Sequence, residues 1–221
     1  MNANEVLALL KKAGKPQTAE IYKRHGSGDN VFGVLTAEIG KLQKKIKVDH
    51  ALAISLLKTG NADARMLALQ IADPEKLTAA EADALAADPH GHFSAYYLCA
   101  LLARSPIADS KMAAWMKSST EGIREAGYAL LAHRLKNDAG SVSDGDAEKH
   151  LATIEKEIHG SPNRARSTMN GAVIAIGTYK PSLRKKALET AKRIGKVEVD
   201  HGETGCKTPD ATATIQKNAK R

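Results

Sequence analysis

The stretch LTAEIGKLQKKI, residues 35–46, places apolar side chains at positions 35, 39, 42 and 46, with mostly polar residues between them. Because an α-helix makes one turn in about 3.6 residues, this spacing puts the four apolar side chains on one stripe of a helix. The same spacing recurs in residues 6–10, 52–57 and 66–71. The sequence therefore predicts amphipathic helices that each have an apolar face to bury.

Short segments rich in Gly, Pro, Asn and Asp interrupt these patterns, and each one signals a helix end or a turn. Clear examples are Gly14-Lys15-Pro16, Asp73-Pro74, Asp88-Pro89, Gly160-Ser161-Pro162 and Lys180-Pro181. Thr78 followed by Glu81 has the pattern of a capping box, which marks a helix start. No segment alternates convincingly with period two, and only residues 196–199 could form a short extended piece.

Many helices joined by short polar turns are typical of an α-solenoid, in which each helix pair buries its apolar face on the next. We therefore predict an all-α fold, an α-solenoid of HEAT-like helical repeats with a concave basic face. An irregular helical bundle is the alternative. The fold is expected to form a single domain over residues 1–221, with residues from about 196 to 221 forming a loop and short helix that act as a C-terminal clasp.

The composition narrows the class of protein. Hydrophobic residues make up 43% of the chain but aromatic residues only 4%, which favours closely packed helices over a β-sandwich. Trp115, with Met112 and Met116 on its helix, is predicted to lie in the core. The two cysteines, Cys99 and Cys206, form no disulfide framework, and neither a signal peptide nor a membrane-spanning run is present. These features predict a soluble, cytoplasmic protein with no membrane partner.

The formal charge is concentrated at one end of the chain. Residues 161–221 hold 13 Lys and Arg against 5 Asp and Glu, whereas residues 1–160 hold 20 of each kind. A neutral body with a cationic end suits a polyanion such as DNA, because each Lys or Arg that neutralises a phosphate releases a counterion. A solvated basic tail, or a protein–protein scaffold whose tail binds an acidic partner, is the alternative interpretation.

Several segments resemble one known family. They are Phe32-Gly33-Val34 with the helix that follows, residues 49–68, Trp115-Met116-Lys117-Ser118 with Glu121 and Arg124, residues 163–177 and residues 195–202. In this order and spacing they resemble the DNA alkylation repair proteins, which are HEAT-like repeat alkylpurine DNA glycosylases. The resemblance implies a cationic cradle that holds alkylated or otherwise damaged double-stranded DNA by its backbone, and hydrolysis of an N-glycosidic bond. We expect a monomer that needs no cofactor and associates with the nucleoid when bound to DNA.

The residues that perform excision in the family are missing at the matching positions. Its Trp-Asp-x-x-Asp pattern falls on residues 91–95, where the key carboxylate is replaced by Ala95, and its second tryptophan falls on Gly171. Residues 89–106 contain neither Asp nor Glu. The sequence therefore leaves open whether the protein is an enzyme, and a non-catalytic module that recognises nucleic-acid structure is the alternative function.

Five residues are predicted to bind DNA. The resemblance assigns Arg124, because it matches the family's arginine at the start of a helix that faces the DNA backbone. Arg164 and Arg166 follow Pro162 at a helix start, where free N–H groups favour phosphate, and Asn170 lies four residues further on the same face. Lys207 adds a cation in the loop near the C-terminus.

The same loop contains candidate catalytic residues. Asp200, His201, Glu203 and Cys206 could supply an acid, a base and a nucleophile within seven residues. A structural clasp and a nucleic-acid contact are the alternatives for this loop. We expect no metal site, because one Cys and one His fall short of the four ligands of a structural zinc site.

Overall fold

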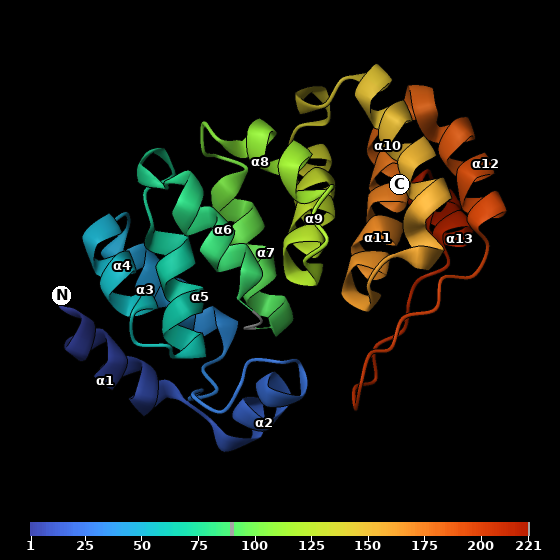
Figure 1. Cartoon of the computed structure of the whole chain (residues 1–221). Helices are drawn as coiled ribbons and strands as arrows, with labels where there is room; N and C mark the ends of the chain where they lie inside the picture. The colour runs from blue at the N-terminus through green and yellow to red at the C-terminus, as the bar shows by residue number, and fades with distance from the viewer. Residues whose placement is uncertain (89–90, 221) are drawn as a thin grey trace. The chain divides into compact units, whose positions relative to one another are not determined.

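The structure, a computed structural model, describes residues 1–88 and 91–220, those at 91–93 by their backbone alone. In this part of the chain the regular structure is helical, with thirteen α-helices and no β-strand (Figure 1), so the predicted all-α class is confirmed. The helices are α1 (Ala3–Ala13), α2 (Pro16–Arg24), α3 (Thr36–Ile46), α4 (His50–Leu57), α5 (Ala62–Ile71), α6 (Ala79–Ala87), α7 (Gly91–Leu102), α8 (Ala108–Trp115), α9 (Glu121–Asn137), α10 (Asp144–Glu157), α11 (Asn163–Tyr179), α12 (Arg184–Ile194) and α13 (Ala211–Asn218).

Helix ends follow the capping chemistry of the sequence. The N–H of Glu81 donates to Thr78 Oγ1 at 3.2 Å and the N–H of Thr78 donates to the Glu81 carboxylate at 2.9 Å, so the predicted capping box is confirmed. These hydrogen bonds to Thr78 lower the pKa of the Glu81 carboxyl group. Residues 196–199 form neither helix nor strand. The break predicted at Asp88-Pro89 extends to residue 89, which lies outside the described residues.

Helices two apart in the chain run in the same direction in the C-terminal half. The most extensive helix–helix contact joins α9 with α11, and α10 also contacts α12. Two ion pairs join α10 with α12 in ascending order in both helices, Glu148–Lys186 at 2.7 Å and Glu155–Arg193 at 2.6 Å, so the two helices are parallel. Asp144, the first residue of α10, pairs at 2.9 Å with Lys180, which precedes α12. Alternate parallel helices are the arrangement expected of stacked helical hairpins.

The chain divides into two compact units. One comprises Met1–Ala108 with Gly202–Thr204, and the other comprises Asp109–His201 with Gly205–Arg221. In a helical stack each helix contacts mainly its neighbours, so two units can belong to one continuous domain or to two. The single domain and its concave basic face stay predictions.

A buried carboxylate fixes the start of the first unit. Asp63, near the N-terminus of α5, is fully buried and accepts the N–H groups of Phe32, Gly33 and Val34 at 2.6, 3.2 and 2.8 Å. Gly33 has φ +78°, and a Cβ there would lie 2.4 Å from the Lys15 carbonyl oxygen, so only glycine fits. The Phe-Gly-Val segment is therefore held in place as the chain enters α3.

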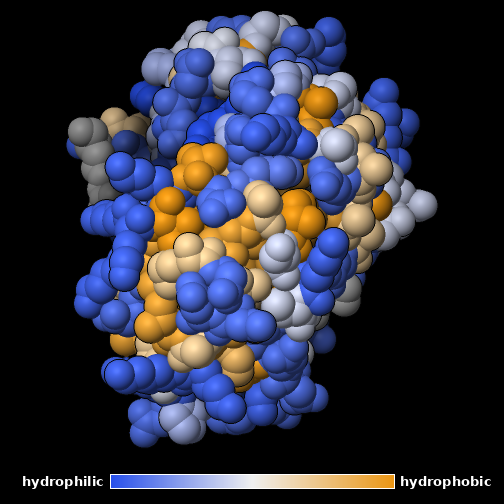
Figure 2. Space-filling view, turned by 90° about the vertical axis from the view of Figure 1, so that its left-hand side faces the viewer, coloured by the Kyte–Doolittle hydropathy of each residue, from blue (hydrophilic) through white to orange (hydrophobic). Residues whose placement is uncertain are grey.

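The core of the second unit includes Trp115, which is 2% exposed, together with the buried Met112 and Met116, so its predicted core position is confirmed. On the first unit, Figure 2 shows apolar side chains gathered over the part that contains α1 and α4, with polar residues around them. Val48, at 60% exposed, is among the exposed large apolar residues of this unit. Among the described residues, no helix combines the length and apolar character needed to cross a bilayer.

A buried isoleucine helps to anchor the C-terminal helix. Ile215 of α13 is fully buried, and a Cβ at Gly177 of α11 would lie 2.7 Å from its Cδ1 atom. The glycine therefore lets α13 approach α11 closely. Between α12 and α13 the chain runs out along residues 195–201 and returns along residues 205–210 (Figure 1).

Candidate nucleic-acid interface

The N-termini of α9 and α11 lie side by side, because the two helices are packed in parallel. The N–H of Arg164, in the first turn of α11, donates to Glu121 Oε1 at 2.9 Å. Glu121 is the first residue of α9. A carboxylate therefore accepts a hydrogen bond at a helix N-terminus, which is a position where the helix dipole and free N–H groups also favour a phosphate.

Arg164 lies against two carboxylates of α9. Its Nε is 3.3 Å from Glu125 Oε2 and 3.6 Å from Glu121 Oε2. The Glu125 side chain is only 12% exposed, and burial raises the pKa of its carboxyl group. Arg164 acts in the opposite direction on that pKa and Glu121 acts in the same direction, but burial has the larger effect. The site thus keeps a strongly desolvated carboxyl group next to a guanidinium.

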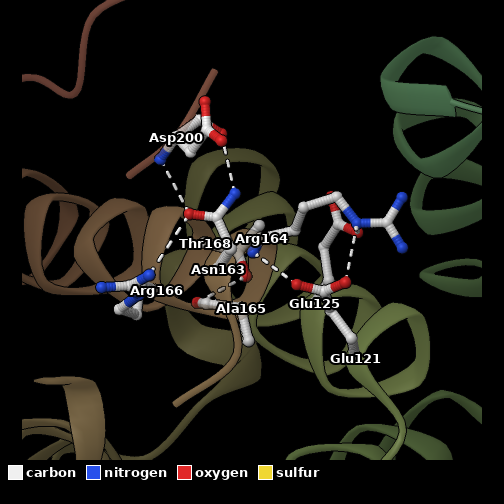
Figure 3. A network of polar contacts seen from close by, with 8 residues as sticks. All are labelled: Glu121, Glu125, Asn163, Arg164, Ala165, Arg166, Thr168 and Asp200. Carbon is white, nitrogen blue, oxygen red and sulfur yellow. Dashed lines mark hydrogen bonds and ion pairs between the residues drawn. The ribbon is translucent and has the colours of Figure 1, made fainter. Parts of the chain in front are cut away.

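The end of the Arg164 guanidinium remains available. Its side chain is 39% exposed, and Figure 3 shows the two terminal nitrogens pointing away from both carboxylates, with no dashed line to either. No hydrogen bond or ion pair engages these two nitrogens among the described residues. A planar fork held at its base by ion pairs is well placed to bind a phosphate in two-point fashion.

Asn163, the first residue of α11, holds the C-terminal segment. Its side-chain amide donates to the Asp200 carbonyl oxygen at 2.7 Å and accepts a hydrogen bond from the Asp200 N–H at 2.8 Å. Both backbone polar groups of Asp200 are thus paired with one side chain. The same amide oxygen accepts a hydrogen bond from Arg166 Nη2 at 3.3 Å (Figure 3). Asn163 therefore joins Arg166 and Asp200, two predicted site residues that are 34 positions apart in the sequence.

The other predicted DNA-binding residues have different positions. Arg124 is 15% exposed and donates to the Glu157 carboxylate. Asn170 is 3% exposed and donates to the Pro209 carbonyl oxygen at 2.9 Å, so in this structure its amide fastens the returning segment and does not reach the surface. Lys207 is exposed. Contact of these residues with DNA stays a prediction.

The loop between α12 and α13 has an outgoing arm, residues 195–201, and a returning arm, residues 205–210. Both arms line a cavity of about 850 Å³, which Asn170 and Lys192 also line. His201 Nε2 lies 3.0 Å from Thr208 Oγ1, which links the outgoing arm to the returning one. Glu203 and Cys206 are exposed, and Asp200 is held through its backbone. These contacts position the loop without identifying a reaction, so catalysis by Asp200, His201, Glu203 or Cys206 stays a prediction.

The folded chain pairs part of the charge that the sequence concentrates near the C-terminus. Lys180, Lys186 and Arg193 form ion pairs with acidic residues of α10, and Lys180 is only 8% exposed. Lys196 pairs with Glu198 at 2.6 Å. The cations that are free to meet a phosphate are therefore fewer than the sequence count indicates.

Sequence reasoning missed Glu121, Glu125 and Asn163. The two glutamates stand four residues apart at the start of a helix, which predicts that they share a face. Nothing local indicates that this face meets α11, because the contact joins residues about 40 positions apart.

Ala95 and Gly171 are the positions that the resemblance aligns with catalytic residues of the family, and this alignment stays a prediction. Ala95 lies on α7 and is partly buried, while Gly171 lies on α11, where a Cβ would meet no atom within 4 Å. A larger side chain at 171 would thus have room, and packing does not require the glycine. The described residues include no group of three or more His, Cys, Asp or Glu that could hold a metal ion.

Comparisons with known proteins agree with the helical architecture. The sequence model of the family described as DNA alkylation repair enzyme matches residues 6–214. The uncharacterized proteins Lin0241 of Listeria innocua and Lmo0209 of Listeria monocytogenes are each 28% identical to the chain over 218 residues, covering 96% of this chain and 95% of each relative.

One solved structure is similar over the whole chain. It has a TM-score of 0.92 and 31% sequence identity, and the match covers 100% of this chain and 94% of the other. That structure is described as representing a new family of proteins related to the HEAT-like repeat DNA glycosylases with affinity for branched DNA structures. The predicted HEAT-like helical-repeat fold is therefore confirmed.

Proposed function

The chain belongs to the DNA alkylation repair enzyme family, and from this premise we propose that it is a non-catalytic DNA-binding protein that recognises branched DNA through the phosphate backbone. One observation carries the proposal: the chain matches, over its full length and with a TM-score of 0.92, a structure whose family is described as having affinity for branched DNA. Backbone contact is supported by the arginines near the N-terminus of α11, and the lack of excision by Ala95 and Gly171.

The cluster formed by Glu121, Glu125, Asn163, Arg164 and Arg166 supports backbone contact. Arg164 presents two terminal nitrogens at the paired N-termini of α9 and α11, where the helix dipoles add positive potential. Arg166 is positioned by Asn163 in the same turn of α11. Contacts of this kind fix a protein on DNA without reading its sequence, which suits recognition of a DNA shape.

The absence of excision is supported by the residues at the matching positions. Stabilising an oxocarbenium-like sugar requires a carboxylate close to the reacting carbon. Ala95 cannot supply one, and Gly171 offers no aromatic ring to hold a cationic base. Glu125, the buried carboxyl group of the arginine cluster, is already opposite Arg164.

The test compares a four-way junction with a linear duplex made from the same arms, titrated at several salt concentrations. We expect the junction to bind more tightly, and log K to fall linearly with log salt for both DNAs. Equal affinity for the two DNAs would contradict recognition of branching. Binding to neither would contradict the proposal as a whole and favour the protein–protein scaffold.

A further inference from the structure

The first unit contains a small cavity beside an exposed aromatic side chain. The cavity, of about 320 Å³, is lined by Gln43 of α3, by Leu69 and Gln70 of α5, and by Tyr96, Tyr97, Ala100, Leu101 and Arg104 from α7 and the residues after it. Tyr96 is 55% exposed although it is a large aromatic residue. Its ring and that of Tyr97 pack edge to face, with centroids 5.4 Å apart and planes at 78°.

This packing holds the Tyr96 ring in a defined orientation. The contact between the two rings favours a fixed geometry, and because Tyr96 is 55% exposed, aromatic surface stays open to a ligand. Such a face can stack on any nucleobase, because every base has a π-surface. Leu69, Ala100 and Leu101 add an apolar base to the cavity.

The polar groups of the cavity suit a ligand that both donates and accepts hydrogen bonds. Gln70 Nε2 donates to the Met66 carbonyl oxygen at 3.0 Å, which orients its amide, and Gln43 contributes a second amide. Arg104 Nε donates to the Ala100 carbonyl oxygen at 3.2 Å, which fixes the guanidinium by one nitrogen. The lining contains no carboxylate, so nothing in it repels an anion.

The size of the cavity agrees with a small ligand. Its volume of about 320 Å³ lies at the lower end of the range for ligand pockets. An exposed tyrosine, two amides and the Arg104 guanidinium are groups that can bind a single base together with an adjoining phosphate.

We infer that this cavity takes one unpaired nucleobase, stacked on Tyr96, with Arg104 contacting its edge or the adjoining phosphate. A base within an intact duplex is paired and stacked on both sides, and so cannot enter. A branch point or gap exposes unpaired bases, so the cavity gives the protein a second means of distinguishing branched DNA from duplex. This inference rests on the proposed DNA binding but involves a different unit from the arginine cluster.

The experiment uses the full-length protein and two DNAs of the same sequence, a linear duplex and a duplex interrupted by a gap of unpaired nucleotides with 2-aminopurine in the gap. For the wild type we expect tighter binding to the gapped DNA and quenching of 2-aminopurine fluorescence. Tyr96→Ala should weaken binding to the gapped DNA by about fivefold or more and abolish the quenching, because it removes the stacking face. Binding to the duplex should be unchanged.

Two further variants serve as controls. Tyr96→Phe keeps the ring and should retain both affinity and quenching, whereas Val48→Ala changes an equally exposed apolar residue of the same unit that does not line the cavity and should have no effect. An equal loss on both DNAs in Tyr96→Ala, or no loss on either, overturns the inference. If the wild type binds the junction but Tyr96→Ala has no effect on gapped DNA, only the inference fails. If the wild type binds no DNA, the proposed function fails with it.

Discussion

Asp63 in the first unit is fully buried and Glu125 in the second is 12% exposed at its side chain; both carboxyl groups lie in the first half of a helix, but their partners differ. Asp63 accepts three backbone N–H groups from one loop, whereas Glu125 faces the guanidinium of Arg164, which is 39% exposed. Burial raises the pKa of both. Asp63 is held by backbone N–H groups, so its role is to stabilise the fold. Glu125 instead lies next to Arg164, a partly exposed cation that a ligand can reach.

The largest expected effect is on stability, and it tests the structural role of Asp63. Asp63→Ala leaves the N–H groups of Phe32, Gly33 and Val34 without their acceptor, and each buried unsatisfied group costs about 1–3 kcal/mol. We therefore expect the free energy of unfolding, measured by urea denaturation, to fall by about 3 kcal/mol or more. Glu125→Ala should cost much less, because Arg164 keeps Glu121. Similar losses in the two variants would contradict the distinction.

The second largest effect concerns DNA binding by the arginines near the N-terminus of α11. Replacing Arg164 and Arg166 together with Ala should weaken binding to duplexes of any sequence and reduce the slope of log K against log salt by up to about 1.8, roughly 0.9 for each phosphate that is no longer neutralised. Arg193→Ala, which removes an arginine paired with Glu155, is the matched control and should leave the slope unchanged. A slope that stays the same in the double variant would show that these arginines do not bind phosphate.

A smaller effect tests the raised pKa of the Glu125 carboxyl group through the pH dependence of stability. Because the pKa of Glu125 is raised in the folded protein, folding favours its protonated form, and that contribution is present below the unfolded-state pKa and lost as pH rises through the folded one. Glu125→Gln, which stays neutral, should therefore gain stability relative to the wild type as pH rises from 4 towards neutrality. Thermal unfolding across this range measures it, and a variant that loses stability relative to the wild type with rising pH would contradict the expectation.

The smallest expected signal is base excision. Release of 7-methylguanine or 3-methyladenine from alkylated DNA under single-turnover conditions should be slow or undetectable, because the resemblance places Ala95 at the position of the family's catalytic carboxylate. If release is robust, Glu125→Gln and single changes at Asp200, His201 and Glu203 would identify the group responsible. Loss of release with unchanged DNA affinity would assign chemistry to that residue.

The sequence predicted what depends on neighbouring residues. The stripe in residues 35–46 corresponds to α3, Thr78 and Glu81 form their capping box, and Arg164 lies in the first turn of a helix after Pro162. These features follow from helical periodicity and from hydrogen bonds between residues three or four apart. Composition and spacing also sufficed to predict an all-α fold, whereas the resemblance to a family came from particular segments such as Phe32-Gly33-Val34 and their order in the chain.

Where the sequence placed a residue on the correct helix face, it could not say what covers that face. Asn170 does lie one turn after Arg166, but Pro209, which is 39 positions away, packs against its amide. The excess of cations in residues 161–221 is also real, yet acidic residues of α10 pair with several of them. In both cases the partner is distant in the chain.

The sequence by itself determined the helices, their ends and the family, because these follow from local periodicity, capping and residue order. Only the tertiary structure decided which charges are paired, which polar side chains are buried, and that Arg164 stands between the N-termini of two parallel helices with its terminal nitrogens available. The reason is physical: a side chain's solvation and partners depend on which helices pack together, and that packing joins residues 31 to 43 positions apart.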